Sequence, residues 1–158
     1  MSGTMKAEGM AELSEMLQRM EENASKVASM ALYDGAGIMA DEINRQAAGI
    51  QTAPFHYAVF ITRQPSPEEK DLVMQGAGIA KFDKNGTEVG TSVGYGNAGY
   101  GDLKGKQVPI PKIVNAINSG TSFMQKQPFV RKAEKAGGTR AMQAMKESIE
   151  RNFDAMTK

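Results

Sequence analysis

The chain contains no cysteine and no tryptophan, and His56 is its single histidine. Because thiolates are missing, a disulfide framework and a cysteine-ligated metal site are both excluded. A zinc site at His56 would need carboxylates or water for its other ligands, and no HExxH spacing is present. We therefore expect neither a metal centre nor a cofactor, and we interpret His56 as a structural or exposed residue.

An excess of charge is also missing, since 19 basic and 18 acidic residues leave a formal net charge of +1. Proteins that bind nucleic acid mainly through phosphate contacts normally carry a clear basic excess. No apolar run approaches the ~18–20 residues that cross a bilayer. The polar start MSGTMKAEGM lacks the apolar core of a secretory signal. We expect a protein made in the cytoplasm, with a flexible tail over residues 1–6, no membrane partner and no specific nucleic-acid partner.

Motifs of catalysis and nucleotide binding are incomplete. Residues 94–99 match GxGxxG, but no helix pattern follows to bind a pyrophosphate. The stretch GDLKGK at 101–106 lacks the spacing of a P-loop. Asp83 begins a calcium-like loop, but Glu88 stands where that loop needs glycine. No Ser/His/Asp arrangement has a local signature, so we expect no enzyme.

The first third of the chain has a helical pattern over residues 7–48. Apolar residues recur at the spacing of one helix face: Leu13, Met16, Leu17, Met20, Ala24, Val27 and Ala31. Gly35 and Gly37 interrupt this region, at ~1 kcal/mol each relative to alanine. A helix of about 40 residues would be ~60 Å long, whereas a compact domain of this size is ~40 Å across. We expect a long helix kinked near the glycines or two consecutive helices; the remaining alternative is a helix that projects from the body. The twelve methionines indicate either a methionine-rich core or an adaptable contact surface.

The middle of the chain contains strand and turn signals. Residues 55–61 are aromatic and β-branched enough for a strand. Ser66, Pro67 and Glu69 together predict the start of a short helix with a capping box. Residues 79–82 and 88–93 predict a hairpin whose turn, 83–87, contains Asn-Gly.

A glycine-rich segment follows the hairpin. Four glycines within eight residues disfavour a packed helix or strand, so we expect a long mobile loop over residues 94–106. Long loops in compact domains are often functional. We interpret this one as a contact loop that comprises Gly94, Tyr95, Gly96, Gly99, Tyr100 and Gly101.

The last third predicts a strand at 108–110, a helix from Pro111 to Gly120, and a turn at 133–136. Thr139 is then expected to cap a final amphipathic helix, whose apolar stripe is Met142, Met145, Ile149, Phe153 and Met156. Long helices before and after a small antiparallel sheet predict a single α+β domain over 1–158.

The stretch NSGTSFMQKQPFVRKA, residues 118–133, combines a helix stop at Gly120 with a later proline-aromatic pair. A proline pushes the residue before it out of the helical region and has a nearly constant φ itself. Pro128 should therefore present Phe129 from a stiff, extended backbone. The simplest alternative is that Phe129 is an ordinary core residue.

The segments Ser119–Ser122 (SGTS) and Gln127–Arg131 (QPFVR), followed by Ala133 and an amphipathic helix, resemble the tail-completion or neck proteins of long-tailed bacteriophages and prophages. The resemblance covers residues 79–153. Asn118 stands where the family commonly has an acid, and Lys132 stands where it commonly has proline.

The resemblance implies a structural virion protein whose copies form a ring at the neck, joining the tail to the head. Its expected partners are itself and neighbouring neck, connector or tail-tube proteins. A structural brace and subunit contact is expected at Gly120, Thr121, Pro128, Phe129, Val130 and Arg131. The alternatives are a tail terminator or another tail morphogenesis factor, and a host-derived binding module for nucleic acid.

Overall fold

The computed structural model of the protein describes residues 10–53, 62–85 and 88–156. The predicted α+β class is confirmed, with a long N-terminal helix, small antiparallel sheets and a C-terminal helix. The helices are α1 (Met10–Ala48), α2 (Pro67–Gly76), α3 (Ile110–Ser119) and α4 (Phe129–Met156). The strands are β1 (Gly78–Ile79), β2 (Asp83–Asn85), β3 (Glu88–Gly90), β4 (Val93–Gly94), β5 (Tyr100–Leu103) and β6 (Lys106–Pro109).

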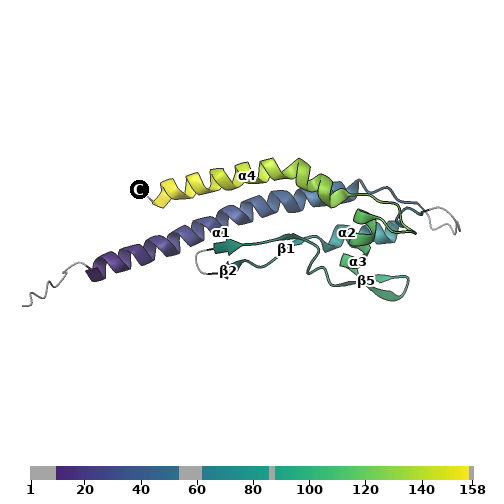
Figure 1. Cartoon of the computed structure of the whole chain (residues 1–158), viewed down its shortest axis with the longest axis horizontal. Helices are drawn as coiled ribbons and strands as arrows, with labels where there is room; N and C mark the ends of the chain where they lie inside the picture. The colour runs from purple at the N-terminus through teal and green to yellow at the C-terminus, as the bar shows by residue number, and fades with distance from the viewer. Residues whose placement is uncertain (1–9, 54–61, 86–87, 157–158) are drawn as a thin grey trace, which may run out of the picture.

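Helices α1 and α4 lie side by side and antiparallel, although residues 49–128 separate them in sequence. We call this pair the helical hairpin, and it dominates the shape of the molecule (Figure 1). Helix α1 has 39 residues, which corresponds to roughly 58 Å. It runs without interruption through Gly35 and Gly37, so a division into two helices is wrong. The helix instead extends beyond the C-terminal end of α4 (Figure 1), and its first turns project from the body.

Small residues allow the two helices to approach closely. A Cβ atom at Gly35 would lie 2.6 Å from Met145 Cγ of α4, and one at Gly137 would lie 3.1 Å from Glu42 Cβ of α1. Buried positions along this seam also include Ala31, Ala36, Ala133, Ala141 and Ser148. Small residues of one helix thus receive larger side chains of the other, such as Met145 against Gly35, whereas Met142, Ile149 and Phe153 of α4 are left exposed.

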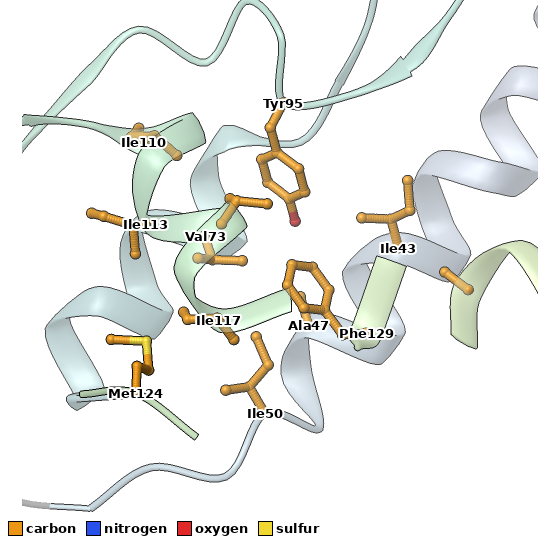
Figure 2. Close-up of a cluster of buried hydrophobic side chains, with 12 residues drawn as sticks. Ile43, Ala47, Ile50, Val73, Tyr95, Ile110, Ile113, Ile117, Met124 and Phe129 are labelled. Atoms are coloured by element: carbon orange, nitrogen blue, oxygen red, sulfur yellow. The ribbon is translucent and has the colours of Figure 1, made fainter. Parts of the chain in front are cut away.

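The hydrophobic core lies where the C-terminal end of α1 meets α2, α3 and the first turns of α4 (Figure 2). Its buried members are Ile43, Ala47, Ile50, Val73, Tyr95, Ile110, Ile113, Val114, Ile117, Met124, Phe129 and Ala133. Lys70 of α2 donates from Nζ to the carbonyl oxygens of Ala48 (2.7 Å) and Ile50 (3.2 Å), which satisfies acceptors at the end of α1. The core is thus confined to one end of the helical hairpin.

The predicted start of α2 is confirmed, because Ser66 and Glu69 form both hydrogen bonds of a capping box. The predicted hairpin is also present, with β1 paired to β4 and β2 paired to β3, both antiparallel. Residues 83–85, which we expected in the turn, form β2 instead. Three residues separate β1 from β2 while two separate β3 from β4. This extra residue has the effect of a β-bulge.

The predicted loop over residues 94–106 is wrong, because Tyr100 and Gly101 begin a second hairpin in which β5 pairs with β6. Its two-residue turn, Lys104 and Gly105, has positive φ at both positions (54° and 79°), as a type I′ turn requires. The carboxylate of Asp102 accepts a hydrogen bond from Gly105 N at 2.9 Å. This turn extends the strand that we expected at 108–110 back to Lys106.

The predicted turn at 133–136 and the predicted cap at Thr139 are also wrong. Helix α4 begins at Phe129 and continues through both glycines at 137 and 138. Its first turn is capped by Asn118, whose Oδ1 accepts a hydrogen bond from Val130 N at 3.2 Å. The expected strand at 55–61, His56 and the expected tail at 1–6 lie outside the described residues.

Candidate functional site

The family-like segment 118–133 begins with a helix end that requires glycine. Gly120 closes α3 with φ 76°, and its N–H donates to the carbonyl oxygen of Ala116 at 3.0 Å. A side chain there would also meet Lys126, since an added Cβ would lie 2.9 Å from Lys126 Cβ. Thr121 continues the turn, because its Oγ1 accepts hydrogen bonds from Phe123 N and Met124 N at 3.2 and 3.0 Å.

Residues 123–127 are then held by backbone and amide hydrogen bonds to two distant segments. Arg63 N donates to Phe123 O at 2.8 Å, and Gln125 N donates to Arg63 O at 2.9 Å. The side chain of Gln127 pairs with the backbone of Gln51 through two hydrogen bonds of 2.8 and 2.9 Å. Backbone groups of three parts of the chain are therefore joined at this point, which is the geometry of a structural brace.

Phe129 lies in the core, with 3% of its surface exposed. Its ring meets that of Tyr95 edge-on, with ring centroids 6.0 Å apart and an interplanar angle of 75°, and Figure 2 shows the two side chains pointing toward one another. Pro128 and Val130 are half-buried, whereas Arg131 is exposed. The structure thus places Phe129 where a neighbouring subunit does not reach it. Arg131 and the exposed Thr121 remain available for contact.

The expected contact loop divides between the core and the surface. Burial raises the pKa of Tyr95 to about 12, and its hydroxyl finds no hydrogen-bond partner among the described residues. Gly101 is buried, and a Cβ there would overlap the side chain of Leu72. Gly96, Gly99 and Tyr100 are exposed, Tyr100 at 70%. Tyr100 is the side chain of this segment that is best placed for contact.

A groove of about 450 Å³ lies over the β1–β4 ladder. Its walls include Gly94 and Gly96, and none of the described residues that line it carries a charge. Among the described residues that line it, Ser92 and Tyr95 carry hydroxyl groups, and no charged group or imidazole stands beside them in the lining.

The most strongly organised charged pair is a bidentate contact between Arg63 and Glu69, with both N–O distances at 2.6 Å. Burial opposes ionisation of Glu69, but hydrogen bonds from Arg63 and from Ser66 N outweigh it and lower the pKa of Glu69 below 4.5. Glu69 also completes the cap of α2. Its partners are all internal, so this pair anchors the segment at 62–64 rather than forming a reactive site.

Large apolar side chains are exposed along the two long helices. Those on α1 are Met16, Leu17, Met20, Met30 and Tyr33, exposed by 45–60%, and those on α4 are Met142 (70%), Ile149 (46%) and Phe153 (59%). At the end remote from the core, a groove of about 350 Å³ lies between the helices, lined by Met20, Ala24, Val27, Ala28, Ile149 and Phe153. The stripe that we predicted on the last helix is therefore largely exposed. The sequence signal for this surface was the apolar spacing along residues 13–31. In the structure, part of this stretch of α1 lies beyond the C-terminal end of α4 (Figure 1).

Comparison of the chain with protein-family models, curated proteins and solved structures gives no match. Within the described ranges, no helix is long and apolar enough to span a bilayer. The same residues contain no group of three or more His, Cys, Asp or Glu side chains that could hold a metal ion.

Proposed function

We propose that this protein is a structural component of the neck, or tail-completion, ring of a tailed bacteriophage, where copies of it join the tail to the head. The observation that carries the proposal is the exposed apolar surface of the α1–α4 hairpin. Contiguous exposed apolar surface is typical of protein–protein interaction sites, and methionine-rich surfaces adapt to their partners.

The braced segment 118–133 supports the same function. It carries the family resemblance, and it joins three parts of the chain by hydrogen bonds. Backbone groups link it to Arg63, the side chain of Gln127 links it to Gln51 just after α1, and the side chain of Asn118 links it to the start of α4. Such a joint keeps the helical hairpin in a constant orientation relative to the core. A subunit that transmits position between two larger assemblies needs this rigidity.

The proposal is tested by locating the protein in assembled particles. Virions from a host that carries the gene with an added epitope tag should contain the protein in a fixed number of copies. Particle reconstruction should place those copies between the head and the tail tube. Deletion of the gene should leave filled heads and finished tails that are not joined.

Two results would overturn the proposal in different ways. Absence of the protein from purified virions would make it an assembly factor. Tails of abnormal length in the deletion strain, with the protein at the end of the tube, would identify a tail terminator.

A further inference from the structure

One face of α4 carries basic and apolar side chains in a single row. Its members follow one another at intervals of three or four residues, which is the spacing of one helix face. Among the described elements, α1 alone lies along α4 beyond its first turns (Figure 1), so the opposite side of α4 is uncovered. All members except the half-buried glycine are exposed. We call this set the outer row: Arg131, Lys135, Gly138, Met142, Lys146, Ile149 and Phe153.

The charged members of the outer row are all basic. None of them forms an ion pair within residues 10–53, 62–85 and 88–156: Arg131, Lys135 and Lys146. Counted at about 100° per residue, two acidic residues and one further lysine border the row: Glu134, Glu150 and Lys132. The remaining acidic residues of α4, Glu147 and Asp154, lie further round the helix. The row and its borders therefore have an excess of positive charge, in a chain whose charges nearly balance.

Gly138 is a member of the row that folding does not explain. Glycine inside a helix costs stability relative to alanine, because it loses more conformational freedom. At the adjacent Gly137 this cost is offset by close packing, since an added Cβ would lie 3.1 Å from Glu42 Cβ. At Gly138 an added Cβ would meet nothing within 4 Å, although the backbone is helical. A glycine beside open space on an outer face allows the backbone of another molecule to approach closely.

The shape and the composition of the row favour one kind of partner. From Arg131 to Phe153 the row is about 33 Å long at 1.5 Å per residue, and it is one helix wide. A second helix can cover such a surface by packing its ridges into the grooves of α4. Nucleic acid would contact the basic groups but would leave the large apolar side chains in water. The outer row of a second copy would oppose like charges, which disfavours pairing of two such faces.

We propose that the outer row of α4 binds an acidic amphipathic helix of another protein. Apolar side chains of that helix cover the apolar members of the row, and its carboxylates pair with the basic members. The two backbones approach most closely at Gly138. The inference deepens the proposed function and rests on it for the source of the partner, a neighbouring protein of the particle. The chemistry of the surface belongs to this chain alone, however, so it can be tested on the purified protein.

The first experiment measures binding of the full chain to two synthetic helical peptides. Both have leucine at positions a and d of three heptads; one has glutamate at e and g, and the other has lysine there. In fluorescence anisotropy, the glutamate peptide should bind at least about 30-fold more tightly, and the difference should shrink as salt is raised. Equal binding of the two peptides, or binding of neither, would overturn the proposal. Tighter binding of duplex DNA or of phosphatidylglycerol vesicles than of the glutamate peptide would also overturn it.

Variants of the full chain locate the binding surface. Met142→Asp and Lys135→Glu should each weaken binding of the glutamate peptide by at least about 10-fold. Ala136→Asp and Lys84→Glu make matching additions of negative charge at exposed positions off the row, and they should leave binding unchanged. Circular dichroism should show all four variants folded, because the replaced side chains are exposed. Equal losses in the row variants and the control variants would mean that only net charge matters, and would overturn the proposal.

Replacements of Gly138 separate binding from folding at one position. Gly138→Ala should raise the melting temperature, because alanine is the better helix former. Gly138→Leu should also remain folded, because the space beside the glycine is open. The leucine should nevertheless weaken binding of the glutamate peptide by at least about 10-fold, since it holds the two backbones apart. A Gly138→Leu chain that binds the peptide as tightly as the natural chain would refute helix packing on the row.

Assembled particles provide a second test, because carbodiimide joins a lysine amine to a carboxylate in contact with it. Lys135 and Lys146 should link to acidic residues of one helical segment of another protein, whereas the exposed Lys84 should not link to that segment. The double variant Lys135→Arg, Lys146→Arg should still assemble but lose both links, because arginine keeps the charge and is not coupled. Links only to a second copy of this chain would overturn the proposal.

Failure of this inference and failure of the proposed function give different results. Absence of the protein from particles would refute the neck proposal, and the peptide measurements would still decide the chemistry of the outer row. Conversely, a protein found between head and tail whose purified chain does not prefer the glutamate peptide would refute the acidic-helix partner alone.

Discussion

Replacement of Phe129 by alanine should destabilise the protein strongly, whereas the same change at Phe123, six residues earlier, should not. Phe129 is 3% exposed and meets the ring of Tyr95, whereas Phe123 is 76% exposed. Truncation of a buried phenylalanine costs ~3–5 kcal/mol, a large part of the ~5–15 kcal/mol that stabilises a typical domain. For a protein of this length, about 4 kcal/mol lowers Tm by roughly 8–16 °C. The exposed change should stay within about 0.5 kcal/mol.

Urea unfolding followed by circular dichroism at constant pH measures both free energies of unfolding. A double-mutant cycle of Phe129→Leu with Tyr95→Leu should add a coupling of about 0.5–1.5 kcal/mol for the edge-to-face pair. The reasoning is refuted if Phe129→Ala costs less than about 1 kcal/mol, or if Phe123→Ala proves the more damaging change. That outcome would restore the interpretation of Phe129 as a surface contact.

Three further changes test separate parts of the structure. Tyr95→Phe removes a buried hydroxyl that has no partner among the described residues; it should leave stability unchanged or raise it by about 1 kcal/mol in thermal melts, and a loss of that size would reveal a partner. Asn118→Ala should cost ~1 kcal/mol because it removes the cap acceptor for Val130 N, whereas Asn118→Asp should preserve or increase stability in the same melts, since an anion at a helix N-terminus is favourable. The pKa of Glu42 is lowered by Gln46 and two arginines and that of Glu69 by Arg63 against its burial. The stability that both carboxylates contribute should be present above pH 4.5, the ordinary value, and be lost as pH falls through the lowered pKa values; urea midpoints that do not change over this range would contradict it.

Local sequence signals predicted the features whose hydrogen-bond partners lie nearby in the chain. The capping box at Ser66 and Glu69 is satisfied within one turn, and the helix stop at Gly120 depends on a carbonyl group four residues earlier. Both were predicted because each pattern is sufficient to form the structure. The α+β class followed in the same way, from periodicity summed over long segments.

The start of α4 was not predicted, because its cap comes from a residue eleven positions before the helix begins. Asn118 reaches Val130 only after the intervening segment has folded against Arg63 and Gln51. Thr139 has the composition of a cap, but the helix is continuous there. Long-range packing of Gly137 against α1 supports a helix through a position that propensity alone disfavours.

The glycine-rich segment shows why composition was misleading at the expected contact loop. Gly101 belongs to a strand and is needed there because Leu72 occupies the space of a side chain. Gly105 instead takes part in a turn with positive φ. The two glycines therefore serve close packing and a tight turn, respectively, so a high glycine content does not by itself indicate mobility.

The choice of small residues along the α1–α4 seam links the fold to the proposed interaction surface. Had large side chains occupied that seam, the two helices would bury their apolar surface against one another and leave polar outer sides. Glycine and alanine instead bring the backbones together, and Met142, Ile149 and Phe153 of α4 remain on the outside. Under the proposed function, the seam of this helix serves folding and its separate apolar stripe serves association. Enlarging the seam should therefore disturb folding, whereas placing a charge on the stripe should disturb assembly alone.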